Sequence, residues 1–465
     1  MLTLLALLCP AALAGSISAP GTIGGPDASA AKPNVAAIHY NPAAIAAIPG
    51  VAVLADVQVA AVRVDATTTR NDGIDPNTGE PYNTAMARVK VPVAIIGATW
   101  AVVPDRLTVG FGVSDVFVGG GNYMAGEPDE EPPYESWQRY AAVATSIITI
   151  HLIPAVGVTV VDGVHVGGSF KYILDTFEAI QASDPLGTEG MGPAGPYTSD
   201  TILTGDLSGS HIGWAAGLFV DRWQYAQVGV SYTNNGKFHA EGEGSLQAPA
   251  LLSASQEIIE VPAALTFDAA LPSVIQAFAR SQVNDKLEVG AGVEVQLWGA
   301  CCSDHEDGDI VIGVNSTNGD PLGPDDGLLI TVGDTQYSPR RLENSMNFAV
   351  NAGYQATEAV WVGGRLGYNQ NAVPDFAVSA TNIDYANVGG TLAARYTIGK
   401  VELGLSYGKF FPFERTIEHA AWNVKEGEAD YVDEYFSPVT PYKAGTNGTY
   451  KARVDAVGVR VAANF

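Results

Sequence analysis

The sequence predicts an all-β fold, a transmembrane antiparallel β-barrel of about 14 strands with an N-terminal hatch, or plug, inside the lumen. Segments of about ten residues alternate between apolar and polar side chains, as expected for a tilted strand that crosses a bilayer. Very short turns alternate with long links along the chain. Residues 15–50, ahead of the first alternating stretch, lack this pattern and are rich in Ala, Gly and Pro.

The last segment, residues 451–465, carries a clear strand pattern. Counting back from Phe465, every second residue as far as Val457 is apolar. An aromatic residue at the end of an apolar face belongs at a membrane interface. Lipid offers no hydrogen bonds to an open strand edge, so this strand must pair on both sides within a closed barrel. We expect the barrel-assembly machinery to recognise the chain through this C-terminal strand.

Composition and charge narrow the possible functions. The chain of 465 residues carries a net charge of −26, which argues against nucleic acid as a partner. No run reaches the roughly 18 apolar residues of a transmembrane helix, whereas barrel strands need no such run. Much of the acid lies in expected loops, such as 127–135 and 304–309, where it either keeps the loops soluble or binds divalent cations.

The N-terminal region has two expected parts. Residues 1–14 are a signal peptide, because a short apolar core ends in Ala-Leu-Ala before Gly15. Cys9 follows two leucines, which does not favour lipidation. Residues 15–50 are the hatch, and residues 51–465 form the transmembrane barrel with long extracellular loops. These features predict a monomer in the outer membrane of a Gram-negative bacterium.

The strands follow one another in a regular order. The alternation runs over 51–61 and returns over 87–95. Each later pair of strands begins at a short turn, and the links at the opposite end are long, which is the asymmetry of outer-membrane barrels. The short turns are Pro104-Asp105, Asp162-Gly163, Asp221-Arg222, Asn284-Asp285, Thr357-Glu358 and Gly399-Lys400.

Two long links are unusually apolar. Residues 181–205 and 245–271 carry many large aliphatic side chains, which an extracellular loop in water does not need. Either these side chains pack together into a cap or they contact an apolar ligand. The candidate ligand-binding residues are Ile202, Leu203, Leu251, Leu252, Ile258 and Ile259.

The first hairpin offers a different candidate. Arg63, Arg88 and Lys90 would receive a ligand carboxylate at the barrel mouth if a bulge near 60–61 turned Arg63 into the lumen. Without that bulge, Arg63 lies above the membrane and meets lipopolysaccharide phosphates. Other charged residues at lumen positions are interpreted as paired wall charges, namely His165, Lys171, Glu288, Glu294, Arg365, Arg395, Glu402 and Arg460.

No catalytic motif accompanies these features. The sequence lacks G-x-S-x-G, H-E-x-x-H, a P-loop and CxxC, so we predict no enzyme, no metal site and no cofactor. His305 among acidic residues is a weak metal pattern. Cys301 and Cys302 are adjacent, which leaves open a vicinal disulfide, an intermolecular bond or free thiols.

The segment 39–45, His-Tyr-Asn-Pro-Ala-Ala-Ile, is similar to the hatch of the FadL/TodX family of outer-membrane transporters for long-chain fatty acids and other hydrophobic compounds. Its Asn41, Pro42 and Ala43 match the family pattern. Further similar segments lie at 166–173, 227–232, 271–287 and 399–416. The resemblance implies a fourteen-stranded barrel, an apolar extracellular groove, a lumenal pocket and sideways exit beside a kinked third strand, here 107–118.

The resulting hypothesis is a passive transporter. It would take up hydrophobic molecules, of the long-chain fatty acid or aromatic hydrocarbon class, through a plugged barrel. The expected partners are this ligand, membrane lipid and lipopolysaccharide. The alternative is a general porin or a structural outer-membrane barrel, which predicts an open, ion-conducting pore that the segment 15–50 disfavours.

Overall fold

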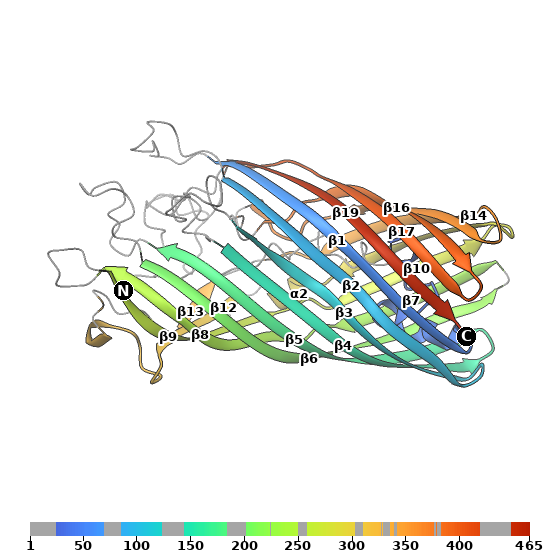
Figure 1. The fold of residues 1–465 in the computed structure, drawn as a ribbon, viewed down its shortest axis with the longest axis horizontal. Helices are drawn as coiled ribbons and strands as arrows, with labels where there is room; N and C mark the ends of the chain where they lie inside the picture. Colours follow the sequence, from blue (N-terminus) through green and yellow to red (C-terminus); the bar gives the residue numbers. More distant parts are fainter. Residues whose placement is uncertain are drawn as a thin grey trace.

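The computed structural model is a closed antiparallel barrel of 14 strands (Figure 1). Each strand pairs with the next one around the wall, and the first pairs with the last to close it. The predicted fold class is therefore confirmed. The strands are β1 (Val51–Thr68), β2 (Ala85–Val103), β3 (Leu107–Asn122), β4 (Ala144–Val161), β5 (Val164–Ser183), β6 (Thr201–Trp223), β7 (Ala226–Asn234), β10 (Val274–Gln282), β11 (Leu287–Gln296), β14 (Ser345–Gln355), β15 (Val360–Asn369), β16 (Asn387–Ile398), β17 (Val401–Pro412) and β19 (Gly448–Asn464).

Several predictions fall outside the part of the chain that is described. This part comprises residues 25–68, 85–122, 144–183, 201–223, 225–249, 258–302, 310–326, 328, 335–338, 342–375, 378, 383–418 and 448–465. The expected signal peptide, Leu251, Leu252 and His305 lie outside it. Within these ranges, no helix has both the length and the apolar character needed to cross a membrane.

The two ends of the barrel differ as predicted (Figure 1). Five of the six predicted short turns join consecutive strands at the end that also holds the C-terminus, whereas Asp221-Arg222 lies within β6, just before the turn to β7. Asp105, Gly163 and Gly399 in these turns have φ of 60°, 73° and 60°, the left-handed conformation that tight turns require. The opposite end carries the long links, so it is the extracellular end of an outer-membrane barrel.

Additional strands lengthen the wall at the extracellular end. The hairpin β8 (Lys237–Pro249) and β9 (Ile258–Ala270) pairs with the edge of β6. Next to β9 lie β12 (Ile310–Ser316) and β13 (Thr335–Ser338), and β18 (Arg415–Ile417) pairs with β19. The predicted link 245–271 is thus largely strand in its described part, which corrects the expectation of a long loop there.

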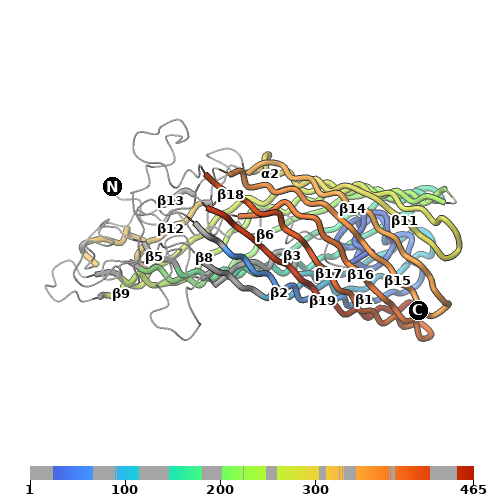
Figure 2. Tube along the Cα trace, turned by 90° about the horizontal axis from the view of Figure 1, so that it is seen from above, coloured from blue at the N-terminus to red at the C-terminus, as the bar shows by residue number. Residues whose placement is uncertain are grey.

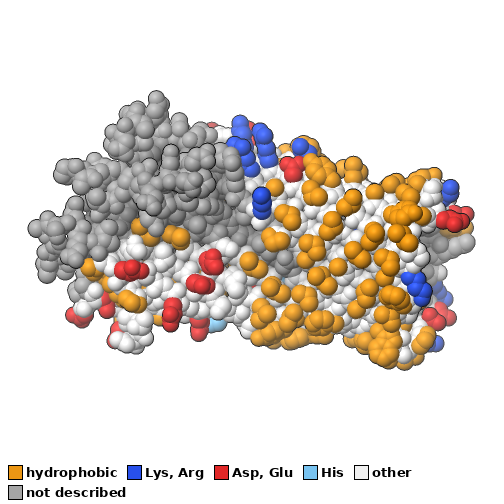
Figure 3. Space-filling view, in the orientation of Figure 1, with side chains coloured by type: hydrophobic (Ala, Val, Ile, Leu, Met, Phe, Trp, Pro, Cys, Tyr) orange, Lys and Arg blue, Asp and Glu red, His pale blue; other side chains and the backbone are white. Residues whose placement is uncertain are grey.

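The outer surface of the wall carries a broad apolar belt (Figure 3). Side chains such as Val59, Leu405 and Val457 point outward and are 45%, 67% and 60% exposed. At the short-turn end the belt finishes in exposed aromatic residues, including Trp100 and Phe465. Such a surface is unfavourable in water and matches a hydrocarbon layer with an aromatic girdle.

The described part of the predicted hatch, residues 25–50, lies inside the barrel near the short-turn end (Figure 2). It folds into η2 (Gly25–Asp27), α1 (Ala37–Tyr40) and η3 (Pro42–Ala47). Most of its residues are buried. The helical segments pack against β3, β4, β5 and β6 on one side and against β14, β15 and β16 on the other. The lumen is therefore filled from wall to wall at this level.

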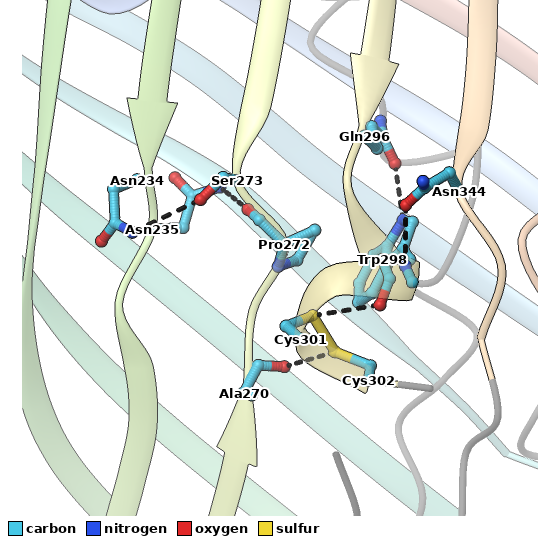
Figure 4. Close-up of a disulfide and its surroundings, with 11 residues drawn as sticks. Asn234, Asn235, Ala270, Pro272, Ser273, Gln296, Trp298, Cys301, Cys302 and Asn344 are labelled. Atoms are coloured by element: carbon cyan, nitrogen blue, oxygen red, sulfur yellow. Dashed lines mark hydrogen bonds between the residues drawn. A yellow bond between two sulfur atoms is a disulfide. The ribbon is translucent and has the colours of Figure 1, made fainter. Parts of the chain in front are cut away.

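A short helix, α2 (Trp298–Cys302), follows β11 and contains a disulfide between Cys301 and Cys302 (Figure 4). The Cys302 sulfur lies 3.5 Å from the carbonyl oxygen of Ala270 at the end of β9. The backbone N–H of Leu342 donates to the Cys302 carbonyl at 3.0 Å. Of the three possibilities left open by the sequence, the structure has the vicinal disulfide, which holds the chain as it leaves β11.

Candidate functional site

Asn41 fixes the hatch to the wall. Its side chain is fully buried, and its Nδ2 donates to the carbonyl oxygens of Ala30 at 2.8 Å and of Leu218 in β6 at 3.0 Å. Its Oδ1 accepts from the N–H of Ala43 at 3.1 Å, which caps η3. Pro42 occupies the first position of η3, where its missing N–H is not needed. The Asn-Pro-Ala segment thus joins the hatch to itself and to β6.

The wall facing the hatch is built from glycine. A Cβ atom on Gly217 of β6 would lie 1.9 Å from the Asn41 Oδ1. A Cβ atom on Gly229 of β7 would lie 1.8 Å from the carbonyl oxygen of Ala30. Both distances are far below contact distance, so any other residue would push the hatch away from the wall.

We therefore expect Gly217→Val to loosen the hatch and raise the ion conductance of the protein in planar bilayers. The matched control is Gly168→Val in β5, because a Cβ atom there meets no atom closer than 3.5 Å. Gly168→Val should keep the low conductance of the natural protein. We call Gly217 and Gly229 the glycine seat of the hatch. Equal conductance in the two variants would contradict the role of this glycine seat.

Ion pairs hold the other side of the hatch. Asp27 of η2 lies 2.6 Å from Arg395 in β16 and 3.4 Å from Arg460 in β19. Its other carboxylate oxygen lies 3.3 Å from Lys32 of the hatch, which is itself 2.9 Å from Glu288 in β11. Asp27 is only 2% exposed. Loss of its carboxylate would therefore leave the buried arginines without one of their counter-charges, which is unfavourable.

Above the hatch, a row of directly opposite residues crosses the four neighbouring strands β3 to β6 and includes three polar side chains. Ser114 of β3 is directly opposite His151 of β4, and His151 and His211 flank Ile173 of β5 from either side. All four residues are buried. His39 of the hatch joins them, with its Nδ1 3.5 Å from the Ser114 hydroxyl. The sequence did not group these residues, because their proximity depends on the pairing register.

Lys171 of β5 lies two positions below this row and is 1% exposed. Among the described residues, no carboxylate lies within ion-pairing distance of its ammonium group. Asp175, two positions above the row, already binds His211 at 2.6 Å. Pairing of wall charges is confirmed for Glu288, Arg395, Glu402 and Arg460. It is not met for Lys171, which is buried and has no ion-pair partner among the described residues.

An apolar cluster lies further toward the extracellular end. Phe177 of β5 is directly opposite Ile147 and Leu207 on the adjacent strands. Phe267 packs on Phe177 with ring centroids 4.6 Å apart and on Phe238 with centroids 5.3 Å apart. The strands therefore place a packed apolar cluster above the polar row and the buried Lys171.

The structure places only some of the predicted apolar ligand-binding residues in this cluster. Leu203 is 2% exposed and belongs to this cluster, and Ile259 packs against it. Ile202 is half-buried at the start of β6, opposite Gln247. The side chain of Ile258 lies outside the described part. The structure thus brings Leu203 and Ile259 to the apolar cluster, through strand pairing and not through a loop.

The first hairpin places its cations on the outer surface. β1 pairs with β2 and β19 without any register shift over Arg63, so the bulge that would turn it inward is absent from these ladders. Val64 packs inside the barrel, and Arg63 therefore points outward with Val59. Lys90, two positions from Arg88 along β2, is also exposed, and the side chain of Arg88 is not described. The hypothesis that Arg63 and Lys90 bind a ligand in the lumen is wrong.

The wall has an irregular strand beside the polar row. The ladder between β2 and β3 stops at Ile95 and Ser114, although both strands continue toward the extracellular end. The register between β3 and β4 shifts between Asp115 and Phe117, so Val116 is an extra residue in β3. The predicted distortion of the third strand is therefore present, next to the residues around Lys171.

A clasp closes part of the extracellular end. Asp384, before β16, accepts hydrogen bonds from the N–H groups of Ala372 and Val373 and lies 3.3 Å from Arg415 of β18. Arg415 also donates to the Val373 carbonyl at 2.9 Å. Burial raises the pKa of the Asp384 carboxyl to about 7, against the opposing effects of these hydrogen bonds and of Arg415.

We call Asp384, its hydrogen-bonded residues Ala372 and Val373, and Arg415 the clasp. The raised pKa of Asp384 predicts that the stability of this clasp depends on pH. The native carboxyl keeps its proton up to about pH 7, whereas the unfolded one loses it near the ordinary pKa of 3.8. The clasp is therefore most stable below this window and loses stability as the pH rises through it. Hydrogen exchange of the Ala372 and Val373 amides, corrected for intrinsic rates, should show protection falling from pH 4 to pH 7. Asp384→Asn should remove this dependence, and an unchanged slope would contradict it.

Comparison with known families gives a clear result. Residues 11–382 match the family described as outer membrane protein transport protein (OMPP1/FadL/TodX). The chain belongs to this family. This FadL/TodX-family barrel is accordingly an outer-membrane protein of a Gram-negative bacterium, and its relatives transport hydrophobic compounds. No curated protein sequence matches the chain.

Solved structures of this FadL/TodX family share the fold at low sequence identity. A FadL homologue from Pseudomonas aeruginosa is 15% identical, with a TM-score of 0.70 over 100% of both chains. The toluene transporter TodX from P. putida is 13% identical, with a TM-score of 0.66 over 97% of this chain and 99% of TodX. The Ralstonia pickettii toluene transporter TbuX is 13% identical, with a TM-score of 0.61 over 99% of both chains.

Proposed function

We propose that this FadL/TodX-family protein takes up apolar molecules that carry an anionic head, such as long-chain carboxylic acids, by passive transport and without a catalytic step. Membership of a transport family, the plugged lumen and the apolar cluster support uptake of hydrophobic compounds. TodX and TbuX are named as toluene transporters. Lys171 favours a different ligand class for this chain.

The observation that carries the proposal is that Lys171 is buried and that no carboxylate of the described residues lies within ion-pairing distance of it. A buried ammonium group without a counter-ion is unfavourable, and an entering carboxylate would supply the missing charge. On β5, the residues that point inward run from Gly167 at the hatch through Lys171 to Phe177 in the apolar cluster. Lys171 and Phe177 are about 20 Å apart along the strand, so a head at Lys171 leaves an extended chain among the aromatic side chains.

The route out of the lumen is proposed to be lateral. The β2–β3 ladder ends at Ser114, in the same row as His151 and near Lys171. A molecule held above the hatch therefore lies beside the irregular part of the wall. Transfer into the membrane replaces water contact with apolar contact, worth about 0.8 kcal/mol per buried methylene, so no energy source is needed.

Binding of hexadecanoate and of its methyl ester to the purified protein tests the ligand class. We expect the acid to bind at least about ten-fold more tightly, because one charge-assisted contact in a buried site is worth roughly 1.5–3 kcal/mol. Lys171→Met should abolish this preference, and Lys171→Arg should keep most of it. If the natural protein binds acid and ester equally, the proposed ligand class is wrong.

The porin alternative is separated from transport by electrical recording. A general porin or purely structural barrel needs no ligand, and a porin conducts ions steadily. The hatch fills the lumen between the glycine seat and the Asp27 ion pairs, which favours a closed resting state. Large, steady conductance of the purified protein in planar bilayers, together with no saturable binding of hexadecanoate, would replace our proposal with the porin.

A further inference from the structure

The cations of the first hairpin belong to a larger basic patch on the outer surface. One row of directly opposite residues crosses four neighbouring strands. It runs from Lys409 of β17 through Asp455 of β19 and Ala61 of β1 to Lys90 of β2. The next outward positions along β1 and β19 are Arg63 and Arg453, followed by Asp65 and Lys451. We call Arg63, Lys90, Lys409, Lys451 and Arg453 the basic patch.

Three of the five cations have acidic partners among the described residues, namely Arg63, Lys409 with Asp455 at 3.8 Å and Lys451 with Glu414 at 3.0 Å. Arg63 and Arg453 are directly opposite one another on paired strands, where like charges are destabilising. Arg63 has one acidic partner, Asp65, at 3.0 Å. Among the described residues, neither Arg453 nor Lys90 has an acidic partner. An anion between the strands would relieve this repulsion.

The depth of the patch is set by the apolar belt. Outward residues of β1 run from Val51 to Ala61 before Arg63, which is about the length of one tilted transmembrane strand. On β19, the outward residue Val457 is 60% exposed and lies just below Asp455 and Arg453. The cations therefore lie at the level of the lipid headgroups on the extracellular side, as Figure 3 shows beyond the orange belt.

Another part of the described wall carries the opposite charge at its extracellular end. Around the wall on β5, β6 and β8, the outward residues at the extracellular end include Glu178, Asp206 and Glu243, which are directly opposite one another. The whole chain has 24 Lys and Arg against 50 Asp and Glu. A concentration of cations at one headgroup position in so acidic a protein indicates a specific anionic partner.

We propose that the basic patch binds the phosphates of an outer-leaflet glycolipid, the lipid A part of lipopolysaccharide. Guanidinium groups bind phosphate with two parallel hydrogen bonds, which suits the Arg63–Arg453 pair. The acyl chains would lie on the apolar belt below, over Val59, Val457 and Tyr407. This binding is separate from ligand transport and does not depend on Lys171.

The test measures binding of purified, full-length protein to lipid A with both phosphates and to the same lipid A after enzymatic removal of its phosphates. The double variant Arg63→Gln/Arg453→Gln should lower affinity for the phosphorylated form about 25-fold, from roughly five-fold per cation near a membrane surface. Arg63→Lys/Arg453→Lys should retain most of the affinity. The matched control is Arg106→Gln/Arg222→Gln, two exposed cations at the short-turn end.

Three results would overturn the proposal. The first is equal binding of the two lipid A forms, because the acyl chains alone would then explain it. The second is an equal loss in the Arg106/Arg222 control, because net charge and not position would be responsible. The third is full displacement by phosphatidylglycerol vesicles, because the patch would then bind any anionic lipid. Heat-modified gel migration of each variant shows that its barrel is folded.

Discussion

Deletion of Val116 is expected to reduce uptake of hydrophobic ligands to the level of protein-free vesicles. Val116 is the extra residue of β3, and without it the register with β4 becomes continuous. A regular β3 can then extend its ladder with β2 beyond Ile95 and seal the wall at the level of Lys171. Ligand binding should remain, because the residues around Lys171 are unchanged. Uptake and binding of hexadecanoate in proteoliposomes measure the two effects separately.

The matched control for this experiment is deletion of Val102. The register between β2 and β3 also shifts between Ala101 and Val103, at the short-turn end of the wall. Removing this second irregularity changes the same strand pair but leaves the extracellular part of the ladder as it is. Uptake at the natural rate after deletion of Val116 would show that ligands leave by another route.

Asp27→Ala is expected to convert the closed protein into an ion-conducting pore. The substitution leaves Arg395 and Arg460 buried without their carboxylate from the hatch. Breaking a buried ion pair by removing one partner costs roughly 3–5 kcal/mol, which would raise the population with a displaced hatch by a factor of about 150 to 5,000. Single-channel recording in planar bilayers measures this change directly.

Asp375→Ala is the matched control for Asp27→Ala. Asp375 also pairs with an arginine, Arg415 at 2.5 Å, but its side chain is 73% exposed. Exposed ion pairs contribute about 0–1 kcal/mol, and Asp375 does not touch the hatch. This variant should stay closed. If Asp27→Ala remains as tightly closed as the natural protein, Asn41 and the glycine seat are sufficient to hold the hatch.

The wall of the barrel was predictable because it depends on local patterns. The alternation from Val51 and the turns such as Asp162-Gly163 each reflect a few neighbouring residues, and the structure has them where they were expected. The hatch segment around Asn41 was recognisable by its loss of alternation and by its similarity to a family. The sequence predicts a loop where the extracellular strands β8 and β9 lie, because their pairing with β6 depends on residues distant along the chain.

The site was only partly predictable, because it depends on pairing between distant strands. His151, Ile173 and His211 form a row through the registers of two ladders, and no spacing along the chain encodes those registers. For Arg63, the sequence predicted a place in the site that the structure does not have. Its face is decided by whether β1 contains a bulge, and the chosen hypothesis required a bulge that the ladders do not have.

One edge of β1 pairs with β19, the last strand of the chain. This edge therefore has no partner until the last strand has been synthesised. Asp56 and Arg460, which face each other across this seam, are 404 residues apart in sequence. An unfinished chain has two unpaired edges, which the bilayer interior does not accept. A newly exported chain therefore cannot close its barrel until residues 448–465 are available. A stop codon anywhere before β19 would yield a substrate for periplasmic proteases and not a shorter channel.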